Sequence, residues 1–158
     1  MKRLLLVLAA TAALLAPART LQAHCEVPCG IYADQHRFEQ MLEDQTTIAK
    51  AIVQITELAE KDDALSQNQL VRWVNTKEAH AVNTQHIVAQ YFLTQRIKPG
   101  NDAASHKVYV QRLIAAHTVI VAAMKCKQTV DPANAESLEK AILDLYRAYE
   151  GKEPELHR

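Results

Sequence analysis

From residue 34 onward, apolar side chains recur at steps of three and four residues along almost the whole chain. That spacing gathers them on one side of an α-helix, whereas a half-buried β-strand alternates with a period of two. No segment of the sequence alternates in that way. The chain also has only three glycines and few aromatic residues, and it is therefore predicted to fold as an all-α protein of amphipathic helices.

Signals at the helix ends predict four helices. Asp34 can cap the first, and Ser66 and Gln69 have the spacing of a capping box for the second. Asp131 followed by Pro132 marks the start of the fourth. Because every link is short, neighbouring helices should be antiparallel, which gives an up-down-up-down four-helix bundle. The expected helices cover about residues 34–61, 66–97, 103–125 and 132–151.

The predicted core consists of the side chains on the four apolar stripes. His117 falls on the third stripe and is expected to be a core histidine, whereas Cys126 should be a partly buried apolar side chain. Gly151 can close the fourth helix, after which the charged tail 152–158 is expected to be loose. The expected core positions are Phe38, Met41, Leu42, Ile48, Ile52, Ile55 and Ala59; Leu70, Val74, Ala81, Val88 and Tyr91 or Phe92; Val110, Leu113, His117, Ile120 and Met124; and Leu138, Ala141, Ile142, Leu145 and Tyr149. Surface or capping roles are expected for His36, His86, His106 and His157.

The N-terminus has the pattern of a secretory signal peptide. Lys2 and Arg3 precede an apolar run over residues 4–16, and Ala23 supplies a small residue for cleavage. The run is shorter than the ~20 residues of a membrane-spanning helix, although an uncleaved anchor is the alternative. Cleavage after Ala23 would leave His24 as the N-terminus of an exported protein, periplasmic or extracellular, with no membrane segment in its mature form.

The mature chain, residues 24–158, is expected to be one compact domain. Removing residues 1–23 takes away three basic residues and no acidic ones, so the balanced chain becomes acidic by three charges. Such a chain carries no signature of a nucleic-acid-binding protein. The domain is divided into an N-terminal segment 24–32, a bundle 33–151 and a tail 152–158.

The segment 24–32, called the hook below, gathers potential metal donors. After cleavage it would offer a free amine and an imidazole from His24 and the thiols of Cys25 and Cys29. Thiolates favour copper(I), zinc, iron clusters or nickel, and in-plane nitrogen and sulfur donors favour square-planar nickel(II) or copper(II). A disulfide between Cys25 and Cys29 is the other reading, because an exported protein meets an oxidising compartment.

The hook sequence His-Cys-x-x-Pro-Cys-Gly-x-Tyr, from His24 to Tyr32, resembles the N-terminal signature of nickel-dependent superoxide dismutases. The resemblance implies a four-helix bundle that disproportionates superoxide to oxygen and hydrogen peroxide by cycling between divalent and trivalent nickel. It implies planar ligation by the amine of His24, the backbone nitrogen and sulfur of Cys25 and the sulfur of Cys29. The imidazole of His24 would be the axial ligand, and Tyr32 would stand beside the metal and limit access to small anions.

The same resemblance implies supporting residues on the helices. Glu39 matches a family glutamate that holds the axial histidine. This match requires the segment between Tyr32 and Glu39 to be one residue shorter than in the family. Arg72 matches one of two family arginines near the site, and His80 stands where the second arginine is expected. The charge of a histidine depends on pH in a way that the charge of an arginine does not.

Partners are also implied by the resemblance. The family assembles as a homohexamer with one nickel ion per subunit, and exposure of the His24 amine requires a signal peptidase or a dedicated maturation protease. An alternative function is a periplasmic metal-binding or metal-delivery protein that uses the N-terminal thiols. A ferritin-like carboxylate bundle would need inward Glu-x-x-His pairs, and the sequence contains none.

Overall fold

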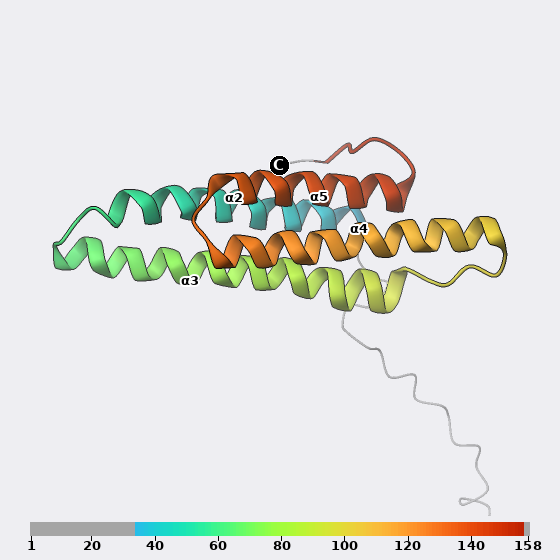
Figure 1. Cartoon of the computed structure of the whole chain (residues 1–158), viewed down its shortest axis with the longest axis horizontal. Helices are drawn as coiled ribbons and strands as arrows, with labels where there is room; N and C mark the ends of the chain where they lie inside the picture. Colours follow the sequence, from blue (N-terminus) through green and yellow to red (C-terminus); the bar gives the residue numbers. More distant parts are fainter. Residues whose placement is uncertain (1–33, 157–158) are drawn as a thin grey trace, which may run out of the picture.

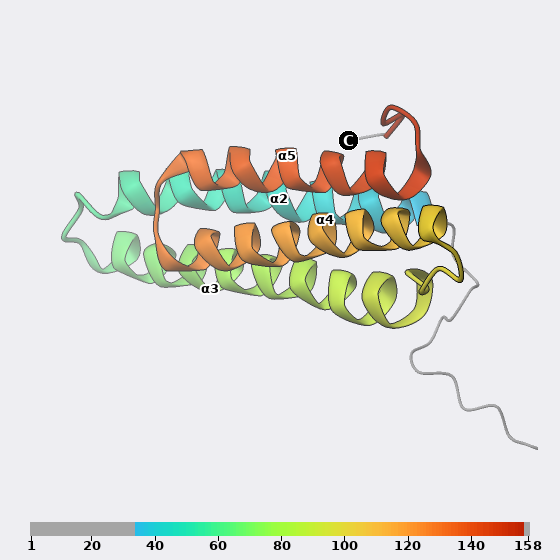
Figure 2. The same cartoon turned by 45° about the vertical axis from the view of Figure 1, so that its right-hand side comes forward.

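The computed structural model describes residues 34–156, and these residues form the predicted all-α four-helix bundle. Successive helices run in opposite directions, as Figure 1 and the rotated view in Figure 2 both show. Contacts join α2 to α3, α3 to α4, α4 to α5 and α5 back to α2, so the four helices enclose one core. The elements are α2 (Asp34–Leu58), α3 (Ala64–His86), its continuation η1 (Ile87–Arg96), α4 (Ala103–Gln128) and α5 (Pro132–Glu150).

The first two helices differ from expectation where they meet. α2 is described from Asp34 and ends at Leu58, earlier than predicted, and Ala59 is exposed rather than buried. The predicted capping box of Ser66 and Gln69 is wrong. Asp63 caps α3 instead, because its carboxylate accepts from both the backbone N–H (3.0 Å) and the hydroxyl (2.6 Å) of Ser66. The helix therefore begins earlier, at Ala64.

The other helix ends follow the sequence signals closely. The carboxylate of Asp102 accepts from the backbone N–H of Ser105 at 2.9 Å, and this capping box opens α4. At α5 the carboxylate of Asp131 accepts from the backbone N–H of Ala133 at 3.0 Å. Gly151 ends α5 with φ of 71°, a left-handed conformation that glycine adopts without steric cost.

The predicted inner face of α4 is wrong. Val110, His117 and Met124 are exposed, and Leu113 and Ile120 are only half-buried. The helix is apolar on more than one side, so spacing alone did not identify the buried face. The side turned inward is mostly alanine, which lets neighbouring helices pack closely. The buried residues of α4 are Ala116, Val119, Ala122, Ala123 and Cys126.

In the other helices most core predictions are confirmed. The exceptions are Val74, which is 37% exposed, and Leu70 and Tyr149, which are half-buried. Tyr91 and Phe92 are both buried, although only one of the two was expected inside. Both lie in η1, a ten-residue π-helix in which each N–H bonds five residues back, so that neighbouring side chains share the inner side.

The segment after α5 is more ordered than its charge suggests. Residues 152–156 run back over the bundle, where the side chain of Leu156 packs against the core. A carboxylate oxygen of Glu153 accepts from the Arg147 guanidinium at 2.9 Å, and the backbone carbonyl of Glu155 accepts from the side-chain amide of Gln35 at 3.3 Å. The expected loose tail is therefore wrong for these residues.

Candidate metal centre

The predicted ligands His24, Cys25 and Cys29, together with Tyr32, lie outside the described residues. The description begins at Asp34, which Ala33 alone separates from Tyr32 in the sequence. The end of the bundle at which α2 begins is therefore the end that the hook joins covalently. The structure shows which side chains the bundle presents there.

A partly buried polar cluster occupies this end of the bundle. One carboxylate oxygen of Asp34 accepts from the hydroxyl of Tyr91 at 2.5 Å. The other accepts from the Arg96 guanidinium at 2.7 Å and from the hydroxyl of Tyr149 at 2.8 Å. Sequence reasoning treated Asp34 as a helix cap only. The available signal was that antiparallel helices bring residues 34, 91 and 149 to the same end, where buried tyrosine hydroxyls need acceptors.

The cluster shifts the ionisation of its members. Partial burial tends to raise the pKa of Asp34, but the hydrogen bonds from Arg96, Tyr91 and Tyr149 outweigh it and hold the pKa below the usual 3.8. Burial, together with the bond to Asp34, raises the pKa of Tyr91 to about 12. At neutral pH the cluster therefore consists of one carboxylate, one guanidinium and two protonated tyrosines.

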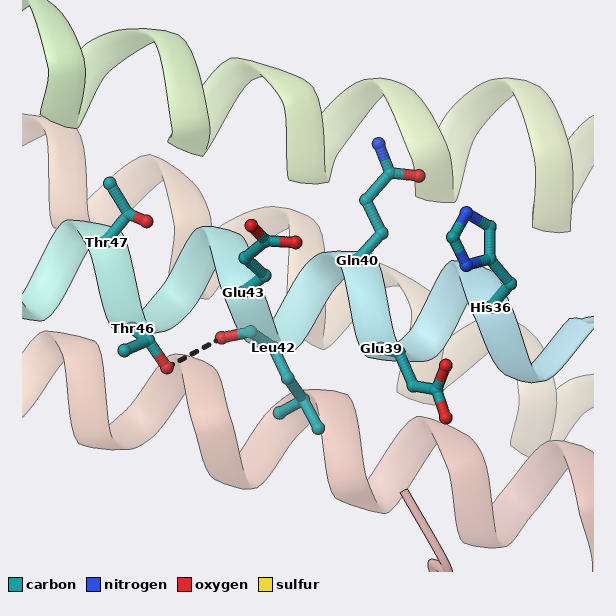
Figure 3. Close-up of a pocket in the computed structure, with 7 residues that line it drawn as sticks. All are labelled: His36, Glu39, Gln40, Leu42, Glu43, Thr46 and Thr47. Carbon is teal, nitrogen blue, oxygen red and sulfur yellow. Dashed lines mark hydrogen bonds between the residues drawn. The ribbon is translucent and has the colours of Figure 1, made fainter. Parts of the chain in front are cut away.

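Glu39 lines an open groove of about 700 Å³ along the outer side of α2. Its side chain is half-buried, and one carboxylate oxygen accepts from the side-chain amide of Gln35 at 3.0 Å. Figure 3 shows Glu39 and Leu42 pointing toward α5, whereas Gln40 points toward α3. The groove is lined by His36, Glu39, Gln40, Leu42, Glu43, Thr46 and Thr47.

His80 is held from the opposite side of α2. Its Nδ1 atom lies 2.6 Å from a carboxylate oxygen of Asp44, whose other oxygen accepts from Asn83 at 2.8 Å and from Thr84 at 3.2 Å. Burial raises the pKa of Asp44, although these three donors oppose the shift. Asp44 was missed from the sequence. The sequence indicated its burial in one way: Asp44 lies four residues before Ile48, at a position of the apolar stripe of α2.

Arg72 lies apart from the other predicted supporting residues. It is exposed on α3, eight residues before His80, which corresponds to about 12 Å along a helix. Because α3 runs antiparallel to α2, this displacement is away from the end that carries Asp34. The structure thus places Glu39 toward α5, His80 on Asp44 and Arg72 farther along α3, and it does not gather the three into one cluster.

The bundle itself offers no alternative metal site within residues 34–156, where no group of three or more His, Cys, Asp and Glu side chains could hold an ion. Cys126 is fully buried, and burial raises its thiol pKa to about 11, which disfavours the thiolate form that binds metals. In the sequence, the imidazole of His24 and the thiols of Cys25 and Cys29, with the amine that cleavage after Ala23 would expose, form a donor set that fits a thiophilic ion such as nickel.

The described residues form a helical bundle, and the sequence before them carries two cysteines and a histidine that are potential metal donors. The family model described as nickel-containing superoxide dismutase matches residues 19–153, and the chain belongs to this family. It is an oxidoreductase that acts on superoxide with a nickel cofactor. Neither a search of curated proteins nor a search of solved structures gives a match.

Proposed function

We propose that the chain is an exported superoxide dismutase whose nickel ion is held by the hook after cleavage at Ala23. The amine and imidazole of His24, the backbone nitrogen and thiolate of Cys25 and the thiolate of Cys29 would hold the ion. The observation that carries this assignment is the donor set itself, combined with the lack of a competing cluster in residues 34–156. Cleavage by a signal peptidase or a dedicated protease is required because an acylated His24 nitrogen would be a poor donor.

When bound, nickel would supply a one-electron couple between its divalent and trivalent states. Two superoxide anions and two protons then give one molecule of oxygen and one of hydrogen peroxide. Tyr32 would limit the approach to small anions. Glu39 would accept a hydrogen bond from the imidazole of His24, a role that its position in the groove on α2 supports. His80, oriented by Asp44, would supply positive charge in place of an arginine only while it is protonated.

We further propose that the protein assembles as a homohexamer with one nickel ion per subunit. The outward side of α4 supports an interface between copies, because Val110, Ile114 and Met124 are 37–61% exposed there. α4 is the one helix among residues 34–156 that is long and apolar enough to cross a membrane. Its packing against α3 and α5 favours a role in the bundle, with the exposed side available for another subunit.

The proposal is tested on protein purified from its exporting host. Mass spectrometry should find His24 at the N-terminus, and metal analysis should find one nickel ion per chain. Loaded protein should remove superoxide and give the paramagnetic resonance signal of trivalent nickel. Replacing Cys25 or Cys29 by serine should abolish nickel binding and activity, whereas the matched variant Cys126→Ser should retain both. A different N-terminus, or copper binding without turnover, would favour a metal-delivery protein.

A further inference from the structure

The four side chains of Asp34, Tyr91, Arg96 and Tyr149, called the Asp34 clamp below, join three elements at the end of the bundle. Asp34 is the first residue of α2, Tyr91 and Arg96 come from η1, and Tyr149 comes from the last turn of α5. Three donors converge on one carboxylate whose side chain is only 15% exposed. Hydrogen bonds to an ionised acceptor are stronger than those between neutral groups, so the clamp fixes this helix start firmly.

The π-helical geometry of η1 allows two of these donors to reach the same carboxylate. Tyr91 and Arg96 are five residues apart. In an α-helix, five residues advance by about 500°, which would leave the two side chains about 140° apart around the axis. A π-helix instead closes its hydrogen bonds from residue i to residue i+5, so residues five apart lie on the same side of the helix. Stretches of π-helix are found frequently at functional sites.

The ring of Tyr91 is held by further contacts. The guanidinium of Arg37 lies 5.2 Å from the centre of the ring, and that of Arg96 lies 5.9 Å from it. The ring also packs against that of Phe92 in an edge-to-face arrangement, at a centroid distance of 5.2 Å. Tyr91 therefore has a fixed place in the bundle, and its bond to Asp34 transmits that place to the start of α2.

We propose that Asp34 is a positioning residue for the hook: by holding the chain at Asp34 against η1 and α5, the clamp restrains the hook relative to the bundle. Two residues of extended chain span at most about 7 Å, so Tyr32 remains tied to whatever holds Asp34. A metal site made from a short chain segment depends on such outer support for its geometry. This inference rests on the proposed nickel site in the hook.

The test compares Asp34→Asn with Asp144→Asn in the mature, full-length protein. Asp144 is a matched control, because its carboxylate also binds an arginine and a second donor, Arg147 at 3.0 Å and Lys140 at 2.5 Å, but on the exposed side of α5. Asp34→Asn should speed amide hydrogen exchange in peptides covering residues 24–40 by at least about fivefold, before and after nickel loading. Its dissociation constant for nickel should rise at least about tenfold.

The loaded variant should also show altered nitrogen hyperfine splitting in the resonance signal of trivalent nickel, which a purely structural loss would not change. Arg96→Gln provides a milder variant of the same clamp, since this guanidinium is 39% exposed, and Arg96→Lys should restore part of the loss. Unchanged exchange over residues 24–40 in Asp34→Asn, or an effect equal to that of Asp144→Asn, would overturn the inference. A wild-type protein that binds no nickel would instead refute the proposed function, and the exchange measurement would still decide whether Asp34 restrains the hook.

Discussion

The Nδ1 atom of His80 lies 2.6 Å from a carboxylate oxygen of Asp44, and this contact joins the middle of α3 to α2. The Asp44 side chain is 5% exposed, whereas that of His80 is 35% exposed. The buried carboxylate thus directs one ring nitrogen inward and leaves the other side of the imidazole toward solvent. In an Nδ1–H···Asp44 arrangement the orientation of the ring is set by the carboxylate, as it is for many functional histidines.

Replacing His80 by alanine should lower the free energy of unfolding by about 1–3 kcal/mol, because a buried carboxylate loses one of its three donors. Urea unfolding followed by circular dichroism measures the change. His117→Ala is the matched control, since His117 is exposed on α4, and its effect should stay within about 0.5 kcal/mol. Equal effects of the two substitutions would mean that the Asp44 contact contributes nothing to stability.

The buried face of a helix can be predicted from the sequence only where the helix has a single apolar side. Stripes with a clear polar side, such as Phe38, Met41 and Leu42 on α2, identify the buried face because only one face can be buried. α4 offers several apolar faces, and the choice among them depends on how closely its alanines allow the neighbours to approach. That is a property of packing between helices, which spacing along one helix does not contain.

The features of the candidate site also differ in how far the sequence predicts them. The hook is a local motif, so its donors are readable in the sequence, whereas its geometry lies outside residues 34–156. The Asp34 clamp depends on the π-helical turn that aligns Tyr91 with Arg96. An ideal α-helix of 3.6 residues per turn would place those two side chains about 140° apart, so helical spacing gives no sign that they share one acceptor. Long-range polar clusters therefore escaped prediction because they require the register between helices.

Lys77 is predicted to be a strong contributor to stability. Its ammonium group, 4% exposed, donates to the backbone carbonyls of Cys126 and Lys127 at 2.7 and 2.8 Å, where α4 ends. Lys77→Met keeps the aliphatic volume but leaves both carbonyls without this donor, and should lower the unfolding free energy by about 2–4 kcal/mol.

The control for Lys77 is Lys140→Met, because Lys140 makes an exposed ion pair with Asp144 one turn away. Exposed pairs of this kind contribute about 0.3–0.5 kcal/mol. Both variants are compared by urea unfolding at one pH. A loss for Lys77→Met that is no larger than that for Lys140→Met would show that the capped carbonyls are satisfied by water instead.

The thiol of Cys126 is predicted to be unreactive toward thiol reagents in the folded protein. Its side chain is fully buried, and burial raises its pKa to about 11 even though the ammonium of Lys77 opposes the shift. At pH 8 the thiolate fraction should be about a thousandth, so a thiol reagent should label Cys126 only as fast as the protein unfolds. In metal-free, reduced protein, peptide mapping should find Cys25 and Cys29 labelled first. Rapid labelling of Cys126 in the folded protein would contradict its burial.

The carboxylates of Asp34 and Asp44 should act on acid stability with opposite signs. Asp34 has a lowered pKa in the folded state, so the unfolded chain binds the proton more tightly. The stabilisation of the folded state by Asp34 is therefore present above the pKa of this group in the unfolded chain, about 3.9. It is lost as the pH falls through the lower pKa of the folded state. Asp44 has a raised pKa, so the folded state binds its proton more tightly. Protonation of Asp44 therefore favours the folded state below the pKa of this group in the unfolded chain. This stabilisation is lost as the pH rises through the higher pKa of the folded state.

Urea unfolding measured from pH 7 to pH 3 separates the two carboxylates. Asp34→Asn should make the loss of stability toward pH 3 shallower than in wild type, because the group that loses stabilisation there has been removed. Asp44→Asn should make the same loss steeper, because the wild-type carboxylate gains its proton preferentially in the folded state over this range and partly offsets the other groups. Both variants lose one negative charge, so a general charge effect would change the two curves in the same direction. Parallel curves would therefore contradict the assigned environments of Asp34 and Asp44.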